Sequence, residues 1–325
     1  MPLFGRRRFS VEGKVVLVTG GSRGLGLALA RELVKRRAQV AITARDTEEL
    51  GRVANELGDV LAVPCDLADP PQIDDMLHEV EAELGAVDVL INNAGIIQVG
   101  PMETMTLDNY EHAMKIHFWA PLRLIDGVLP AMRNRGSGRI VNITSVGGRI
   151  AVPHLLPYST SKFALVGLSR GLRVELRKDD IMVTTVCPGL MRTGSARHAT
   201  FKGRNDLEYA WFATVSTLPV ISMAVTRAAK RIINGLERGK AELVLGAPAK
   251  LGVIAQAVSP TITAALLSLV DRALPKPGGI GSAEAKGSES QAVELPSWVS
   301  TPLHAAEEAN NELVDTDGGL ERTIN

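Results

Sequence analysis

The sequence predicts a doubly wound α/β fold, in which a parallel sheet carries helices on both faces. One supporting observation is a series of short, continuous apolar runs such as Lys14-Val-Val-Leu-Val-Thr19, which is typical of strands buried on both faces of a parallel sheet. The other is that these runs alternate with segments in which apolar residues recur at helical spacing, as at Leu25, Leu29 and Leu33. Such alternation indicates parallel strands joined by right-handed helical crossovers.

The predicted elements follow one another in a regular order along the chain. The predicted strands are 14–19, 39–43, 60–63, 87–91, 139–143 and 182–186, with 242–245 as a last one. Between them, helical patterns begin near Leu25 and cover 71–84, 107–132 and about 158–177. No internal repeat is evident, so we expect a single α/β domain rather than a repeat array.

Composition divides the chain into four expected regions. A basic lead, 1–12, precedes the α/β domain at 13–250, and an apolar segment, 251–275, precedes a tail at 276–325. The tail holds nine acidic and three basic residues and few apolar ones, so we expect it to be largely disordered. The formal net charge of the whole chain is zero, which argues against a nucleic-acid partner.

The apolar segment leaves the relation to a membrane open. Residues 251–270 contain no charged side chain and are long enough to be a transmembrane candidate, but Pro260, with Ser259 as its N-cap, indicates a new helix. A lid or packing helix, an interfacial membrane contact and a true span all remain, and we expect peripheral attachment at most. Two cysteines cannot form a disulfide framework and no signal peptide is evident, so a cytoplasmic location is expected.

A glycine-rich turn connects the first predicted strand to the first predicted helix. It reads Thr19-Gly-Gly-Ser-Arg-Gly-Leu-Gly26. Glycines at such a position let backbone N–H groups and the helix N-terminus approach a pyrophosphate, so the turn predicts a dinucleotide site. The candidate cofactor-binding residues in this turn are Thr19, Gly20, Ser22, Arg23, Gly24, Leu25 and Gly26.

A second motif predicts proton transfer. Tyr158 and Lys162 are four residues apart and therefore lie on the same face of a helix, where a nearby ammonium would favour the phenolate and lower the pKa of the tyrosine. Ser145, 13 residues upstream of Tyr158, is placed to hold the oxygen that gains or loses the proton. Combined with a dinucleotide site, this constellation indicates hydride transfer.

These motifs, in this order, resemble those of the short-chain dehydrogenases/reductases over most of residues 10–250, which implies a Rossmann-like fold. The glycine turn has the spacing of that family, and Tyr158-x-x-x-Lys162 matches its catalytic motif. By the same resemblance, Tyr158 would be the general acid or base, Lys162 would also hold the nicotinamide ribose, and Ser145 would orient the substrate. Further positions that resemble cofactor contacts are Asp66, Leu67, Asn93, Ala94, Gly95, Pro188, Gly189 and Thr193.

One position departs from the family pattern. His117 stands where the family usually has an asparagine that helps to hold a water between the lysine and solvent. A neutral histidine offers one donor and one acceptor, so we expect the proton relay to persist and count His117 among the catalytic candidates. The same substitution is what a non-catalytic alternative would show, namely an NADP(H) sensor or scaffold with decayed catalysis.

Charge at the end of the second strand predicts the choice of cofactor. An acidic residue there would bind the ribose 2′-hydroxyl and repel a 2′-phosphate, but this chain has Ala44 followed by Arg45. Arg45 and Arg23 together favour NADP(H) through charge-assisted hydrogen bonds. Asp46 is the exception, since its carboxylate would either pair with Arg45 or turn toward the ribose.

The substrate is predicted only by class. The segment from Thr193 to Leu218 is expected to be a substrate lid, and residues 150–156 are mostly apolar. Apolar walls favour a hydrophobic alcohol or carbonyl compound, although ordinary core packing explains the same residues. A lipid-modifying reductase at the membrane surface is a further alternative. The family resemblance also implies a homodimer or homotetramer, and no metal site is expected. The lid contains four aromatic residues: Phe201, Tyr209, Trp211 and Phe212.

Overall fold

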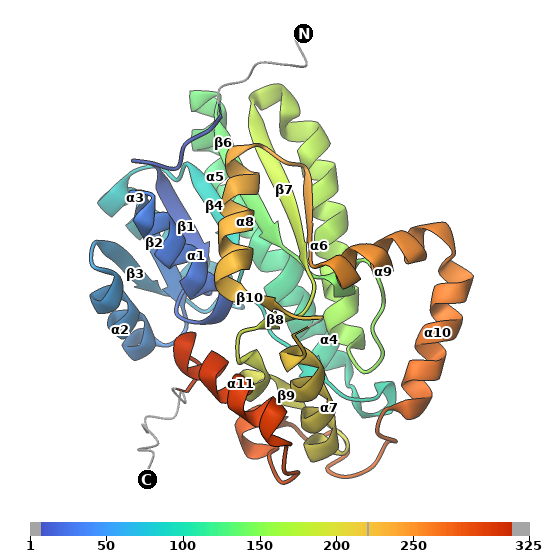
Figure 1. Ribbon diagram of the computed structural model, residues 1–325. Helices are drawn as coiled ribbons and strands as arrows, with labels where there is room; N and C mark the ends of the chain where they lie inside the picture. Colours follow the sequence, from blue (N-terminus) through green and yellow to red (C-terminus); the bar gives the residue numbers. More distant parts are fainter. Residues whose placement is uncertain (1–7, 220, 314–325) are drawn as a thin grey trace.

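The computed structural model describes residues 8–219 and 221–313, and its centre is one parallel sheet of seven strands (Figure 1). The strand order is β11-β7-β6-β4-β1-β2-β3, and every neighbouring pair is parallel. This is the doubly wound arrangement that the sequence predicts. The strands are β1 (Val15–Thr19), β2 (Gln39–Ala44), β3 (Val60–Pro64), β4 (Val89–Asn92), β6 (Gly138–Ile143), β7 (Ile181–Pro188) and β11 (Glu242–Leu245).

Helices cover both faces of the sheet, and a separate core lies under each layer. On one face α1, α2 and α8 bury residues such as Leu33, Leu50 and Ile232 against the sheet. On the other face α3 and α5 contribute Met76 and Leu124 to a second core, which α6 helps to cover. The helices of these layers are α1 (Gly24–Lys35), α2 (Thr47–Leu57), α3 (Pro70–Leu84), α4 (Leu107–Met114), α5 (Ala120–Arg135), α6 (Leu156–Glu175) and α8 (Val225–Glu237).

The remaining elements surround the carboxyl ends of the strands. A third core joins α7 to α11 around Phe201, and β12 pairs antiparallel with β9 next to it. Figure 1 shows α7, α11 and β9 below the sheet, whereas α9 and α10 lie at one side of the molecule. The elements are β5 (Gln98–Val99), β8 (Met191–Arg192), β9 (Thr200–Phe201), β10 (Met223–Ala224), β12 (Ala285–Lys286), α7 (Asn205–Thr217), α9 (Ala247–Val258), α10 (Pro260–Ala273) and α11 (Ser297–Ala309).

The long helix predicted over 107–132 is interrupted. A π-helical turn, η2 (Lys115–Trp119), separates α4 from α5, and Pro121 lies at the start of α5. A π-turn accommodates one extra residue in the helix and is frequent at functional sites. Pro121 lies directly after this turn and has no N–H to donate to it, which disturbs the regular hydrogen-bond ladder at this point. His117 is in this turn and is buried.

The apolar segment 251–270 forms two helices, because α9 ends at Val258 and α10 begins at Pro260. The new helix at Pro260 is the one that the sequence predicts. Most large apolar side chains of α9 and α10 are exposed, and α10 buries none of its residues. Among the described residues, no helix is both long and apolar enough to cross a membrane.

The described part of the predicted disordered tail is folded. Residues 276–313 pack over the carboxyl ends of the strands, and the side chains of Val299 and Leu303 in α11 are buried. Disorder was the wrong prediction for 276–313, because two apolar residues at helical spacing and backbone pairing between β12 and β9 are enough to dock the segment. Residues 314–325 of the tail and 1–7 of the basic lead lie outside the described residues.

Candidate active site

A cavity of about 530 Å³ opens at the carboxyl ends of the central strands. The chain turns outward in opposite directions from the neighbouring strands β1 and β4, and ligands of doubly wound folds bind at such a switch point. All of the candidate site residues named from the sequence line this cavity except Thr19 and His117. Those two lie directly behind its wall.

The glycine turn is shaped by close backbone approach. A Cβ atom on Gly26 would lie only 1.8 Å from the carbonyl oxygen of Gly20, so no other residue fits there without moving the turn. Gly20 itself has a φ of +63° and would meet the Cα of Ala94 at 2.9 Å if it carried a Cβ. The result is a shallow cradle at the N-terminus of α1, which suits a phosphate.

Two polar side chains hold this cradle in place. The Asn93 side-chain amide donates to the carbonyl oxygens of Thr19 (2.9 Å) and Gly20 (3.1 Å). In return, Thr19 Oγ1 accepts from the backbone N–H of Asn93 (2.9 Å) and of Ala94 (3.0 Å). Thr19 therefore acts on the turn from behind, by joining the end of β1 to the end of β4.

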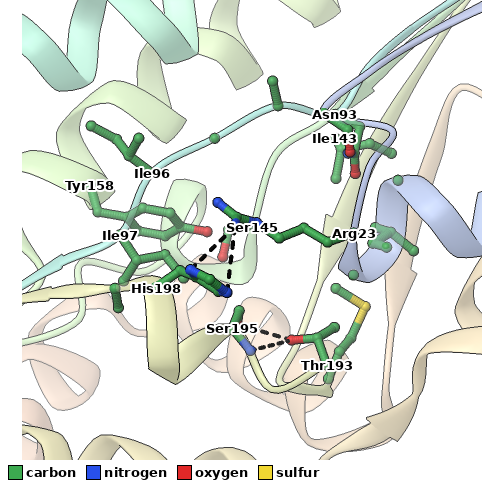
Figure 2. A pocket seen from close by; sticks show the side chains of 18 of the residues that line it. Arg23, Asn93, Ile96, Ile97, Ile143, Ser145, Tyr158, Thr193, Ser195 and His198 are labelled. Atoms are coloured by element: carbon green, nitrogen blue, oxygen red, sulfur yellow. Dashed lines mark hydrogen bonds between the residues drawn. The ribbon is translucent and has the colours of Figure 1, made fainter. Parts of the chain in front are cut away.

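Ser145, Tyr158 and Lys162 meet at the centre of the cavity. Ser145 follows β6 and its Oγ accepts from the backbone N–H of Gly147 at 3.0 Å. In Figure 2 the ring of Tyr158 points its hydroxyl toward Ser145. Lys162, one helical turn further along α6, places its Nζ 5.7 Å from the centre of the Tyr158 ring and donates to the Ile143 carbonyl oxygen at 3.1 Å.

The protonation of this group differs from the sequence-based prediction. Burial raises the pKa of Tyr158, and its hydrogen bond with Ser145 opposes that rise. Burial also lowers the pKa of Lys162 to about 7. The predicted lowering of the Tyr158 pKa by Lys162 is not observed, because burial of the phenol dominates and the opposing contribution comes from the Ser145 hydrogen bond. Tyr158 is therefore protonated at neutral pH, while Lys162 is close to its midpoint.

His117 is fixed in one neutral tautomer behind Lys162. Its Nε2 accepts a hydrogen bond from the Ile96 backbone N–H at 3.0 Å, so the proton resides on Nδ1, which lies 2.7 Å from Ser161 Oγ. Burial and the charge of Lys162 hold the pKa of His117 well below its usual range. His117 thus supports the backbone at Ile96 and the start of α6 without reaching the cavity.

The two arginines of the predicted 2′-phosphate site lie in different surroundings. Arg45 is exposed at the rim, whereas the side chain of Arg23 extends across the cavity to His198 (Nη1 to Nδ1, 3.2 Å; Figure 2). Asp46 caps α2 by accepting from the Glu49 backbone N–H at 2.8 Å, which answers the question that the sequence left open for its carboxylate. Asp46 thus binds the backbone of α2, while the Arg45 side chain stays exposed at the rim of the cavity.

The other predicted cofactor contacts take up positions around the cavity. Asp66 follows β3 and accepts from the Ala68 backbone N–H at 2.9 Å, beside Leu67. On the opposite wall Gly189 donates its N–H to the Leu245 carbonyl oxygen at 2.9 Å, and Thr193 Oγ1 donates to Ser195 Oγ at 2.9 Å. Further residues from the predicted set line the same walls, namely Leu25, Gly95 and Pro188.

The far end of the cavity, beyond Tyr158, is apolar. Of the four lid aromatics, Trp211 and Phe212 line it, whereas Phe201 and Tyr209 are buried in the third core. The second pair therefore supports the lid through edge-to-face ring contacts rather than facing a ligand. Other apolar lining residues at this end come from several loops and from α7: Ile96, Ile97, Val152, Leu155 and Val215.

The polar lining residues that the sequence did not predict include Glu49, His198 and Glu312. Glu49 is buried and accepts from Ser22 Oγ at 2.9 Å, and burial raises its pKa. Glu312 belongs to the segment predicted to be disordered. A lone carboxylate in a polar stretch carries no signal of burial, so the sequence does not indicate that Glu49 and Glu312 lie in the cavity.

Comparison with known proteins agrees with this geometry. The family model for short chain dehydrogenases matches residues 14–202. The Mycobacterium tuberculosis protein SadH, named as an oxidoreductase, is 35% identical over 247 residues, which cover 74% of this chain and 89% of that protein. The ketoacyl reductase HetN of Nostoc sp. is 33% identical over 225 residues, covering 68% of this chain and 77% of HetN.

Solved structures give the same result. A short-chain dehydrogenase from Streptomyces avermitilis is 33% identical, with a TM-score of 0.70 over 80% of this chain and 98% of that one. A gluconate 5-dehydrogenase from Burkholderia cenocepacia, in complex with NADP and tartrate, is 26% identical with a TM-score of 0.64 over 75% of this chain and 97% of that one. The chain belongs to the short-chain dehydrogenase/reductase family and is an oxidoreductase of alcohol and carbonyl groups.

Proposed function

We propose that the protein is an NADP(H)-dependent reductase or dehydrogenase that interconverts a hydrophobic ketone or aldehyde and its alcohol. The observation that carries the proposal is the position of Tyr158. Its hydroxyl lies between a phosphate cradle on one side and an apolar chamber on the other, within one cavity. A substrate carbonyl held at Tyr158 is therefore next to the dinucleotide site.

The chain's own residues would divide the chemistry among them. When bound, the dinucleotide supplies or accepts the hydride. In reduction Tyr158 would donate its hydroxyl proton to the carbonyl oxygen, and its raised pKa keeps that proton in place at neutral pH. Ser145 would donate a hydrogen bond to the same oxygen, since its Oγ already accepts from Gly147. Lys162, with a pKa of about 7, would return a proton to Tyr158.

The cradle fits a dinucleotide by its shape and its donors. Gly20 and Gly26 leave room for close backbone approach, and the N-terminus of α1 faces the cavity. The preference for NADP(H) rests on Arg23 and Arg45, together with the capping role of Asp46, which directs that carboxylate to the backbone of α2. The relative solved with NADP supports the same cofactor.

The test is a titration followed by a substrate panel. Isothermal titration calorimetry should give at least tenfold tighter binding of NADPH than of NADH, about 1.4 kcal/mol. Turnover of aliphatic and aromatic ketones, aldehydes and alcohols can then be followed at the NADPH absorbance band. We expect apolar substrates to be turned over with a higher kcat/KM than sugars. Binding of NADPH without turnover of any of these compounds would support the sensor alternative instead.

We also propose that the protein is a homo-oligomer in the cytoplasm. Trp119 of the π-turn and Phe163 and Val174 of α6 are exposed although they are large and apolar. Such side chains on the long helices would be covered in a dimer or tetramer. Light scattering during gel filtration gives the subunit number, and a monomer at micromolar concentration would contradict the proposal.

A peripheral membrane contact is proposed on a different observation. Helices α9 and α10 expose apolar residues along both of their lengths, and Figure 1 shows them at one side of the molecule. A lipid surface would cover them and would bring a lipid-like substrate close to the cavity. Cell membranes washed with high salt and then with carbonate should release the protein, whereas release by detergent alone would contradict peripheral attachment.

A further inference from the structure

The last described residues of the chain lie across the glycine turn. After α11 ends at Ala309, the chain continues through Asn310, Asn311 and Glu312, which we call the C-terminal strap. Figure 1 shows α11, in red, beside α7, with its C-terminal end toward α1 and α2. The strap is thus carried to the cofactor side of the cavity by a helix that is itself anchored in the third core through Leu303.

The strap engages two of the donors that a dinucleotide would use, the Gly24 N–H and the Arg23 guanidinium, and makes a further bond to a carbonyl oxygen of the turn. The backbone N–H of Gly24, at the first position of α1, donates to the Asn310 carbonyl oxygen at 2.9 Å. The Asn311 side-chain amide donates to the Ser22 carbonyl oxygen at 3.0 Å. The Glu312 carboxyl group lies 3.9 Å from Arg23 Nε. Helix N-terminal N–H groups and a guanidinium are the groups that bind phosphate, so the strap occupies a phosphate position.

The space above the turn is filled as well. A Cβ atom on Gly24 would meet Glu312 Oε1 at 2.9 Å, so the carboxyl group rests directly on the first turn of α1. The Glu312 carbonyl oxygen lies 2.8 Å from His198 Nε2, on the opposite wall. Glu312 is 2% exposed. Glu312 therefore reaches from the first turn of α1 to His198 on the opposite wall, so the strap lies over the cradle.

We propose that the C-terminal strap is a built-in competitor of the dinucleotide, which must leave the glycine turn before NADP(H) binds. This inference rests on the cofactor proposed above. Release of the strap alone is sufficient, because α11 is held by its own apolar contacts and would keep the strap nearby. Since the binding-competent state is then only a fraction of the molecules, the apparent cofactor affinity is reduced by that fraction.

The charges around Glu312 make the competition dependent on pH. Arg23 and His198 face the carboxyl group, as do the acidic side chains of Glu49 and Glu307. Burial is the main reason that the pKa of Glu312 is raised to about 8, with Glu49 and Glu307 adding to it and Arg23 opposing. A raised pKa means that docking is fully supported below the usual value of 4.5 and is progressively lost as the pH rises to about 8.

The test compares two shortened chains with the full one. A chain that ends at residue 309 lacks the strap, whereas a chain that ends at residue 313 keeps it and controls for loss of the final residues. By calorimetry the first should bind NADPH about tenfold more tightly than the full chain at pH 6, and the second should match the full chain. The advantage of the first should shrink toward pH 9.

Point variants guard against a folding defect in the shortened chain. Asn311→Ala and Glu312→Ala in the full chain should each tighten NADPH binding severalfold, while Glu308→Ala, an exposed position on α11, should not. Hydrogen exchange of 310–313 should become faster when NADPH is added. Equal or weaker NADPH binding without the strap, or slower exchange, would overturn the proposal. Absence of NADPH and NADH binding in every form would instead overturn the cofactor assignment and the strap together.

Discussion

The two ends of the cavity are built in different ways. At the cofactor end the backbone itself is the binding surface, and Asn93 and Thr19 tie the glycine turn to the neighbouring strand with four hydrogen bonds. At the substrate end the surface consists of side chains such as Ile97, Val152 and Phe212, which come from separate loops and from the lid. The shape of the cofactor end is fixed by main-chain geometry, and that of the substrate end by side-chain packing. Substitutions at one end should therefore leave binding at the other end unchanged.

Tyr158 lies at the boundary, and its loss gives the largest expected effect. Tyr158→Phe removes the proton donor but keeps the ring, so kcat should fall by about 10²–10⁴ while the Kd for NADPH changes less than about twofold. Stopped-flow turnover and calorimetry check the two quantities. Tyr110→Phe, outside the cavity, is the matched control. Substantial turnover by Tyr158→Phe would show that Tyr158 is not the proton donor and that the reaction does not take place where the two ends of the cavity meet.

Lys162 is proposed to serve both the proton transfer and the binding of the cofactor, so its replacement should affect both. Lys162→Met should lower kcat/KM by about 10² and also weaken NADPH binding, because one ammonium serves the proton relay and the ribose. Lys178→Met, at an exposed position, is the control. A variant that loses turnover but binds NADPH normally would assign Lys162 to the chemical step alone.

The same variant should be more stable than the parent. The pKa of Lys162 is depressed from 10.5 to about 7, so ionised Lys162 destabilises the folded state, fully at or below pH 7 and not at all above pH 10.5. Lys162→Met should therefore raise the free energy of unfolding by about 1–3 kcal/mol at pH 7. Urea unfolding at pH 7 and pH 10 checks this, and the gain should shrink at the higher pH.

Cofactor choice tests the charged end alone. Arg45→Asp should narrow the preference for NADPH over NADH by about tenfold, because it replaces an attractive charge at the rim with a repulsive one. Arg52→Asp, on α2 outside the cavity, changes the charge equally and should have little effect. Comparable losses in both variants would mean that long-range charge, rather than a contact at residue 45, sets the preference.

The smallest expected effect concerns the apolar end. Val215→Ser should raise KM for a hydrophobic ketone by about fivefold, about 1 kcal/mol, and leave NADPH affinity unchanged. Thr214→Ser, next to it on α7 but outside the cavity, is the control. If the KM of Val215→Ser matches that of the parent, the apolar end is not where the substrate binds.

The contrast between the two ends also explains what sequence could predict. The last strand, 242–245, was predictable from its apolar run. The position of the glycine turn at the cavity was predictable because its glycines stand where no other residue fits. The apolar chamber depends on which side chains of several loops face inward, and no periodic pattern records this. The folded state of 276–313 depends on two buried apolar residues of α11, Val299 and Leu303, too few to register in composition.

The site itself shows the same division. The placement of Tyr158 next to Lys162 follows from helical spacing, so it was predictable, whereas their pKa values depend on burial, which spacing does not reveal. His117 was identified as unusual from its type. Its hydrogen bond to the Ile96 backbone requires the π-turn, and a local irregularity of this kind has no sequence signature.

The contact between Gly24 and Asn310 joins parts of the chain that are 286 residues apart. During synthesis the seven-stranded sheet has all of its strands once residue 245 has left the ribosome, and domains begin to fold as units as they emerge. The glycine turn is therefore synthesised long before residues 310–312, which cover it. Under the proposed competition, a nascent chain that has not yet reached residue 310 would display an open dinucleotide cradle and would bind the cofactor more tightly than a chain whose strap is docked.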